Sequence, residues 1–237
     1  MWLDVLVRET GGDELTARRV HYVLCGQHLI GELWQDKTIA EVHIRGTRVM
    51  VVDKHGIREV SGFPTATVAA QAIEAVEAAK ERMRAVITGI GDSVVVSRID
   101  ATPLTASDLI TSGALTEDLA SQVGSALEHM DAVTVIGPAA HVVIRAFASF
   151  IPQESRVFEG PYGILPNGCV AAASPLDADY VIGVRPGVPA EPMAAAGQVG
   201  ALIANPETDF RAAVRLVVLG RISSIRKVTR VQEAAPF

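Results

Sequence analysis

The sequence has few of the features that mark secreted or nucleic-acid-binding proteins. Its two cysteines, Cys25 and Cys169, are too few and too far apart for a disulfide framework, which agrees with a reducing compartment. Aromatic residues make up 5% of the chain and the formal net charge is −6, so the sequence shows neither a stacking platform nor a basic footprint for nucleic acid. We therefore expect two ordinary buried thiols and no nucleic-acid partner.

Long apolar runs are also missing, although hydrophobic residues make up 49% of the chain. No stretch approaches the roughly 20 consecutive apolar residues that a membrane-spanning helix needs. The first residues, MWLDVLVRETGGDE, carry acids early and lack the basic flank and apolar core of a signal peptide. These absences predict a cytoplasmic protein without a transmembrane segment.

The pattern that is present is that of an α/β protein in two halves. In the first half we expect a helix near 13–33, an antiparallel meander over 39–60 and an amphipathic helix over 65–84. Two strands follow over 85–99, and Thr105 to Asp108 matches a capping box. This half is predicted to form a small α+β domain over residues 1–130.

The second half, residues 131–237, alternates candidate strands with helices. The candidate strands are 132–136, 156–158, 169–173, 179–184 and 200–203. This alternation favours a mostly parallel sheet covered on both faces. Asn205-Pro206-Glu207 has the form of a helix start, and that helix would turn Phe210, Val214 and Val217 inward. Residues 222–232 suggest a last strand.

Residues 132–150 read as a buried strand, a tight turn and an amphipathic helix, which is the layout that cradles phosphates. A phosphate loop also needs converging backbone N–H groups, a lysine and a Ser or Thr for magnesium. The turn here is Gly137-Pro138-Ala139-Ala140 followed by His141, and Pro138 has no N–H to donate. The strand, turn and helix of a phosphate loop are therefore predicted, but the lysine and the Ser or Thr are missing.

Several stretches, in the right order, resemble the type II/type IV secretion ATPase superfamily, nearest to its tight-adherence (Flp pilus) assembly branch. The meander over 39–60 resembles the family's N-terminal segment, and residues 97–123 resemble its linker, with PLTASDLITSGALTEDL as the most specific part. Residues 132–158 and 177–216 resemble the phosphate-loop and Walker B regions of the RecA-like core. The likeness covers about residues 38 to 219. It implies a truncated RecA-like (P-loop NTPase-type) second domain.

Carried over by this resemblance, the phosphate-loop lysine falls on Ala140 and the threonine on His141. In the acidic box Glu159 aligns, but Gly160 stands where a second carboxylate is expected. Without the lysine and the magnesium ligand, the positioning and charge stabilisation that drive phosphoryl transfer are lost.

The resemblance also places the Walker B segment at 180–185, where Gly183 and Arg185 are kept but the glutamate is missing. That glutamate would be the general base for the attacking water. The family's histidine is missing from ALIANP, residues 201–206. These losses imply a pseudo-ATPase with no cofactor.

Other candidate sites compete with simpler interpretations. His21, Cys25 and His28 have a spacing that could ligate zinc, although a packed helix face is the simpler explanation and we expect no metal. The remaining histidines show no ligand spacing and are expected at the surface or as caps: His43, His55, His129 and His141. Arg98 and Arg145 are candidates for contact with a nucleotide or a neighbouring subunit, against a solvated or salt-bridged arginine.

Two classes of function remain open from the sequence. The first is a catalytically inactive interaction or regulatory subunit, with a secretion ATPase paralogue, a pilus platform protein or itself as partner. Such a protein would be peripheral to the inner membrane only through its partners. The alternative is a weak NTPase, or a nucleotide sensor, that binds ATP and Mg²⁺ through an altered loop, with Arg98, Glu159 and Arg185 as residual contacts.

Overall fold

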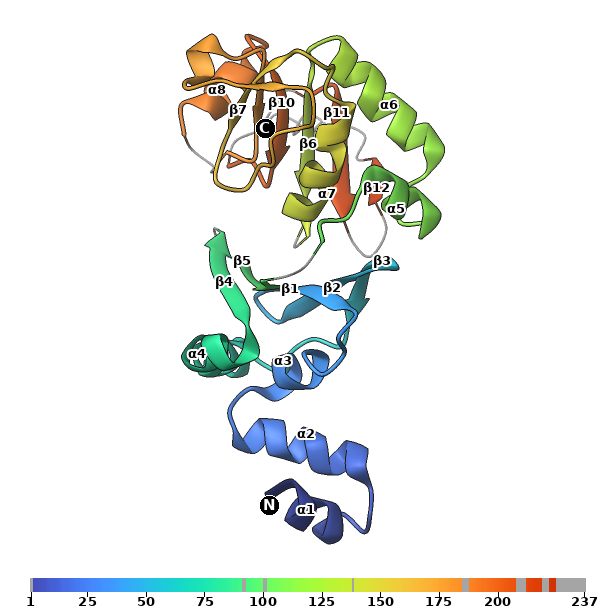
Figure 1. Cartoon of the computed structure of the whole chain (residues 1–237), viewed down its shortest axis with the longest axis vertical. Helices are drawn as coiled ribbons and strands as arrows, with labels where there is room; N and C mark the ends of the chain where they lie inside the picture. Colours follow the sequence, from blue (N-terminus) through green and yellow to red (C-terminus); the bar gives the residue numbers. More distant parts are fainter. Residues whose placement is uncertain are drawn as a thin grey trace, which may run out of the picture.

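The computed structural model describes residues 2–90, 93–99, 102–137, 139–184, 188–207, 212–218 and 222–224. Helical segments are α1 (Trp2–Glu9), α2 (Glu14–Leu24), α3 (His28–Leu33), α4 (Ala66–Met83), α5 (Ala106–Thr111), α6 (Glu117–Glu128), α7 (Ala140–Phe147) and α8 (Ala190–Ala195), with 3-10 turns at Ala148–Phe150 and Pro175–Asp177. Strands are β1 (Ile39–Arg45), β2 (Arg48–Asp53), β3 (Gly56–Val60), β4 (Ala85–Ile90), β5 (Ser93–Arg98), β6 (Ala132–Ile136), β7 (Arg156–Glu159), β8 (Val170–Ala171), β9 (Tyr180–Ile182), β10 (Gly200–Ala204), β11 (Val214–Val218) and β12 (Ile222–Ser224). Figure 1 shows the N-terminal helices at one end, a first sheet in the middle and a second sheet at the other end.

The N-terminal segment forms two helices where the sequence predicted one over 13–33. Asp13 caps α2 by accepting hydrogen bonds from the backbone of Leu15 and Thr16. Gly26 then adopts φ +74°, which only glycine takes without strain, and the chain restarts as α3. The expectation of one helix was wrong because this left-handed residue ends the first one.

The first sheet is antiparallel, with strand order β3-β2-β1-β5-β4. The predicted meander and the two strands that follow the helix are confirmed. Helix α4 buries its Ala69, Ala72 and Val76 side against this sheet, as its 3.6-residue period predicted.

The helices between the two sheets pack with the second sheet. Thr105 and Asp108 form the predicted capping box of α5, and Thr116 caps α6. Leu109, Val123 and Leu127 share a core with β6 and α7. Helices α5 and α6 precede residue 130, yet they pack against the second sheet. The predicted domain boundary at residue 130 stays a prediction.

The second sheet has strand order β12-β11-β6-β10-β9-β7-β8 and is parallel except for the β11–β12 pair. Alternate residues of β10 face opposite ways: Leu202 joins the core under α6 and α7, whereas Ala201 and Ile203 pack toward α8. The sheet is thus covered on both faces, with β6 and its following helix at its centre. The predicted fold class is confirmed as an α/β chain in which a small α+β part precedes a mostly parallel sheet, whereas the RecA-like type of that sheet stays a prediction.

The helix predicted after Asn205 is wrong over the residues described. Asn205 has φ +48°, whereas a helix N-cap takes extended backbone angles. Val214 and Val217, expected on a helix, lie in β11 and pair with β6. The branched residues of the segment VRLVV suit a strand, and pairing with the central strand outweighs the local cap signal. Phe210 and the tail beyond residue 224 lie outside the described residues.

Candidate functional site

The turn that follows β6 is hydrogen-bonded to Asn205, the residue directly after β10. The Gly137 N–H donates to Oδ1 of Asn205 at 2.8 Å, and Nδ2 of Asn205 donates back to the Gly137 carbonyl at 3.1 Å. Gly137 has φ +133°, and a Cβ at this position would lie 2.5 Å from the Val218 carbonyl oxygen of β11. Only glycine fits here, and both of its backbone polar groups are paired with one carboxamide.

The first turn of α7 is buried, and its backbone N–H groups donate hydrogen bonds to carbonyl groups of the same turn. Ala139 and Ala140 are fully buried, and the Ala140 N–H donates to the Gly137 carbonyl at 3.2 Å. The Val142 N–H donates to the Ala139 carbonyl. Pro138 lies outside the described residues. The positions that the resemblance assigns to lysine and threonine are therefore occupied by Ala140 and His141, which supply no ammonium and no hydroxyl.

His141 is buried beside this turn with its polar atoms unpaired. The residue is 3% exposed, and neither ring nitrogen has a hydrogen-bond partner in the part of the chain that the structure describes. The ring packs edge-on to Tyr162, with 4.8 Å between centroids. Burial, followed by electrostatic interaction with the basic groups His43 and Arg145, lowers the pKa of His141 to about 4. His141 is therefore neutral at physiological pH.

A charged cluster next to His141 joins α7 to the first sheet. Oε1 of Glu41 accepts from Arg145 at 2.6 Å, and Oε2 of Glu41 lies 2.8 Å from Nε2 of His43. Burial alone would raise the pKa of Glu41, but its hydrogen bonds and ion pairs with His43 and Arg145 outweigh burial and lower that pKa to about 2. The cluster therefore holds a carboxylate between two basic groups.

A cavity of about 160 Å³ lies between this cluster and the loop after β7. Its lining residues are His43, Thr88, Val95, Ser97, His141, Arg145, Pro161, Tyr162 and Gly163. Sites for whole small-molecule ligands are usually about 300–1,000 Å³. The cavity beside the turn is therefore too small for a complete nucleotide in this conformation.

The backbone of the loop after β7 lies directly against the backbone at the end of β9. The Gly160 N–H donates to Ile182, and the Tyr162 N–H donates to Gly183. A Cβ on Gly160 would lie 2.4 Å from the Gly183 carbonyl oxygen, and one on Gly183 would lie 1.9 Å from the Gly163 nitrogen. Gly160, where the resemblance expects a carboxylate, occupies a position with no room for a side chain.

The candidate contacts named from the sequence are spread over the molecule. Glu159 is the exposed last residue of β7, and Arg185 lies outside the described residues. Ser97 lines the cavity beside His141, so its neighbour Arg98 projects from the opposite face of β5. There Arg98 donates to the backbone carbonyls of Trp34, Asp36 and Ile39. The structure thus groups Gly137, Ala139, Ala140 and His141, but it separates Arg98 from them. Contact of Arg98, Glu159 or Arg185 with a nucleotide stays a prediction.

The histidines depart in part from their expected surface positions. His43 and His141 are buried, which corrects the prediction, because α7 covers the face of β1 that carries His43. His129 caps α6 as expected, with Nδ1 at 2.7 Å from the Ser125 carbonyl. Arg145 is salt-bridged, the simpler of its two interpretations.

The possible zinc ligands are not gathered into a metal centre in the described residues. Cys25 Sγ lies 3.7 Å from Nε2 of His21, and His28 begins the next helix. No group of three or more His, Cys, Asp or Glu side chains among the residues described is placed to hold a metal ion. The packed face expected here is also wrong at Leu24, which is 72% exposed.

Sequence reasoning missed the Asn205–Gly137 pairing and the Glu41–Arg145 bridge. Asn205 has a visible signal, an amide directly after an apolar strand, but that signal equally describes a helix cap. Glu41 and His43 alternate on one strand, which places them on one face. Nothing in the sequence says which helix covers that face.

Comparison with known proteins gives a weak likeness. No protein-family model matches the chain, and no curated protein matches it in sequence. Among solved structures the chain is similar to the VirB11 ATPase from the Brucella suis type IV secretion system, solved in complex with sulphate. The identity is 15%, the match covers 81% of this chain and 78% of that one, and the TM-score is 0.29. No helix within the described ranges is long and apolar enough to cross a membrane.

Proposed function

We propose that this protein is a catalytically inactive homologue of the secretion ATPases that acts as an interaction or regulatory subunit of a Flp-type pilus or related secretion system. Its expected partners are a secretion ATPase paralogue, a pilus platform protein or a second copy of itself. It would work in the cytoplasm and reach the inner membrane through those partners.

The observation that carries this proposal is the turn between β6 and α7. Gly137 gives both of its backbone polar groups to Asn205, and the turn offers no lysine and no magnesium-binding hydroxyl. Catalysis of phosphoryl transfer depends almost entirely on such groups and on bound Mg²⁺. A turn that is already paired with its own chain favours a structural role for this part of the fold.

The test is magnesium-dependent ATP hydrolysis by the purified full chain, with an active secretion ATPase assayed in parallel. We expect no turnover above the buffer blank. Turnover that requires magnesium and is abolished by Glu159→Ala would overturn the proposal in favour of a weak NTPase.

Partner capture tests the second half of the proposal. Affinity purification from cells that assemble such a machine is expected to recover a secretion ATPase or a platform protein. A solitary monomer in cells that make the machine would contradict an interaction role, whatever the hydrolysis assay shows.

A second candidate function, nucleotide sensing, is favoured by the groups beside the turn. His141 has two unpaired buried nitrogens next to a small cavity that also contains Arg145. A rearrangement that opened this cavity would bring a cation and a hydrogen-bonding ring toward a phosphate group. ATP binding without turnover would support this candidate.

A further inference from the structure

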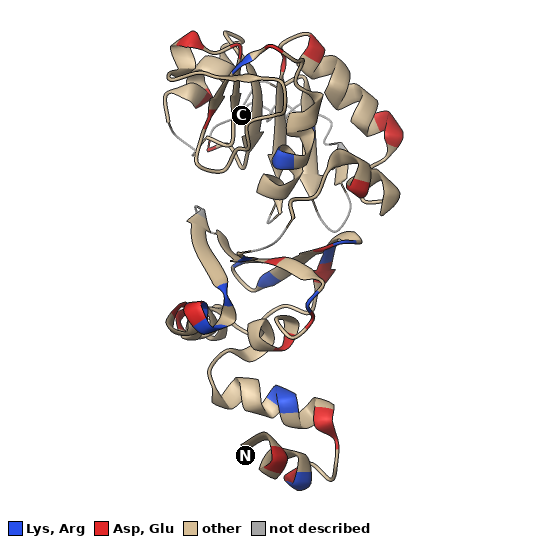
Figure 2. Cartoon of the chain, in the orientation of Figure 1, with Lys and Arg blue, Asp and Glu red and all other residues tan. Residues whose placement is uncertain are grey.

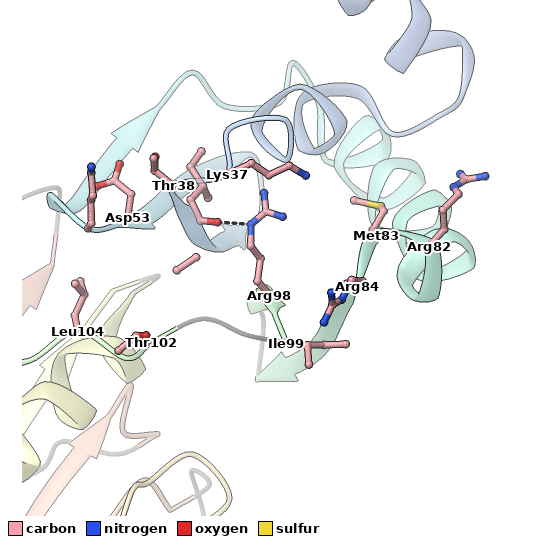
Figure 3. A pocket seen from close by; sticks show the side chains of 13 residues that line it. Lys37, Thr38, Asp53, Arg82, Met83, Arg84, Arg98, Ile99, Thr102 and Leu104 are labelled. Carbon is pink, nitrogen blue, oxygen red and sulfur yellow. Dashed lines mark hydrogen bonds between the residues drawn. The ribbon is translucent and has the colours of Figure 1, made fainter.

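A second, larger cavity lies at the edge of the first sheet, where β1 and β4 begin and β2 and β5 end. Its volume is about 510 Å³, which falls within the range of about 300–1,000 Å³ usual for small-molecule sites. It is lined by Lys37, Thr38, Ile39, Ala40, Asp53, Lys54, Arg82, Met83, Arg84, Arg98, Ile99, Thr102 and Leu104. In the view of Figure 3, Lys37, Arg84 and Arg98 lie on one side of this pocket, and Asp53, Thr102 and Leu104 lie on the other.

The described residues that line this cavity are mostly basic where they are charged, in a chain whose net charge is −6. Among the lining residues that the structure describes, five are lysine or arginine and Asp53 is the one acid. Asp53 is already used: it accepts from the Arg58 side chain at 3.2 Å and from the His55 backbone at 2.7 Å. Both of these partners of Asp53 lie outside the cavity lining. Figure 2 shows how Lys and Arg are distributed over the first sheet and α4.

Three of these cations have no carboxylate partner in the part of the chain that the structure describes: Lys37, Lys54 and Arg82. All three are exposed and come from separate segments. Like charges held around one cavity repel one another, and an anion bound between them relieves that repulsion.

Arg98 gives the cavity a cation that is fixed in place. Its Nε donates to the Ile39 carbonyl at 2.6 Å, and its Nη2 donates to the carbonyls of Trp34 at 2.7 Å and Asp36 at 3.0 Å. The guanidinium also lies 4.3 Å from the centroid of the Trp34 ring. Burial lowers the pKa of Arg98, although arginine stays charged at physiological pH. A preorganised cation loses little side-chain freedom when it binds an anion.

This cavity is separate from the turn after β6. Val95 and Ser97 of β5 line the cavity beside His141, whereas Arg98 lines the larger one, as the alternation of a strand requires. A ligand in the larger cavity would contact neither Gly137 nor Asn205.

We propose that this cavity binds a small molecule carrying two or more phosphate groups, through Lys37, Lys54, Arg82 and Arg98. Ammonium and guanidinium groups bind phosphate through charge-assisted hydrogen bonds, and two or more phosphate groups supply enough negative charge for several cations at once. The phosphate groups belong either to a free metabolite or to the headgroup of an anionic lipid. This proposal does not depend on the proposed function, because it concerns other residues and the other face of the sheet.

The experiment is calorimetric titration of inorganic tripolyphosphate into the full chain at low ionic strength. Lys37→Gln/Lys54→Gln is expected to weaken binding at least tenfold, because two charge contacts are removed. Both side chains are exposed, so the variant should keep the circular dichroism spectrum and melting temperature of the parent. Binding of the parent should also weaken as salt is added.

The matched control is Arg18→Gln/Lys80→Gln, which removes the same charge from exposed helix positions outside the cavity. It is expected to change the affinity less than twofold. Absence of binding to the parent chain, or equal weakening in both variants, would overturn the proposal.

Vesicles of cardiolipin, which carries two phosphate groups, and of phosphatidylcholine distinguish the two sources. Binding to tripolyphosphate alone identifies a free metabolite as the ligand class. Binding to cardiolipin vesicles that Lys37→Gln/Lys54→Gln abolishes and the control keeps identifies a lipid headgroup. The same variant also distinguishes two possible ATP sites. Heat of ATP binding that is lost in the variant is assigned to this cavity, and heat that remains in the variant is assigned to the turn after β6.

Discussion

Asn205 is the residue on which the turn after β6 depends most directly. Its carboxamide is paired with both backbone polar groups of Gly137, which is buried. We expect Asn205→Gly to lower the free energy of unfolding by about 1–3 kcal/mol, because a buried donor and acceptor lose their partner. Glycine is the fitting replacement, since it tolerates φ +48°. Urea denaturation measures the change.

The control for this prediction is Asn167→Gly, at an exposed loop position. It carries the same entropic cost of a new glycine, about 0.4–1 kcal/mol, without the lost pairing. Equal losses in the two variants would show that the Gly137 pairing contributes nothing to stability.

His141 makes stability depend on pH. Its pKa is lowered from 6.5 to about 4 by burial, so between these values the unfolded chain binds a proton that the folded chain does not. Stability therefore falls as pH falls through this window, by about 2 kcal/mol between about pH 7 and pH 5. His141→Phe, which keeps an aromatic contact with Tyr162, should remove this part of the pH dependence. Urea unfolding of both proteins at the two pH values tests it.

His55→Phe, at an exposed histidine, is the comparison for this test and should change the pH dependence less than His141→Phe does. The lowered pKa of Glu41 affects stability only further down, between pH 4.5 and about 2, which is outside the range of the measurement. An unchanged pH dependence in His141→Phe would contradict the assignment.

At the scale of elements, the Arg145–Glu41 bridge connects α7 to β1. The Glu41 side chain is 9% exposed and that of Arg145 is 24% exposed, so the pair is only partly screened by water. Arg145→Gln should cost about 2 kcal/mol, because it leaves a buried carboxylate with one partner fewer. A double-mutant cycle with Glu41→Gln should give a coupling of about 1–2 kcal/mol.

The exposed pair Arg48–Glu59, with 46% and 41% exposed side chains, supplies the reference cycle. Its coupling should stay below about 1 kcal/mol. If the Arg145–Glu41 cycle gave additive losses, the bridge would not be what holds α7 against the first sheet.

Helices and strands with a clear residue period and a capping residue could be predicted from the sequence. Segments whose structure depends on pairing with a distant strand could not. Helix α4 has a period, a cap at Thr65 and basic residues at its end, and it forms as expected. Strand β11 has a cap-like Asn-Pro-Glu before it and a pattern that fits two structures. Its pairing with β6 decides the outcome, and that pairing is invisible in one sequence.

The sequence predicted the strand, turn and helix that form the site, but it did not predict the contacts that this turn and helix make with distant residues. Gly137 to His141 lie between a central strand and a helix, as the pattern indicated. That His43 is buried, and that Asn205 reaches Gly137, depend on contacts between residues far apart in the chain. Local spacing carries no information about such contacts.

At the scale of the whole molecule, the two sheets share one hydrophobic cluster. Met50, Val52 and Ile57 of the first sheet belong to the same core as α5, α6 and α7. We expect one cooperative unfolding transition, because burial on one side depends on the other side staying folded. The two tryptophans, Trp2 and Trp34, both precede the first sheet, so tryptophan fluorescence reports only on that end.

Far-UV circular dichroism reports on helices from both ends, including α5 to α8. Denaturation followed by fluorescence and by circular dichroism should therefore give the same midpoint. Two separate midpoints would mean that the first sheet unfolds independently of the second.

The pairing of Gly137 with Asn205 also supplies a spectroscopic reporter. A backbone amide proton that is buried and bonded exchanges slowly with solvent water, and it loses this protection when its acceptor leaves. Gly137 is one of 20 glycines, so glycine-selective ¹⁵N labelling would isolate its amide signal in a short list of resonances. Following that one resonance while a partner or nucleotide is added would show directly whether the turn opens.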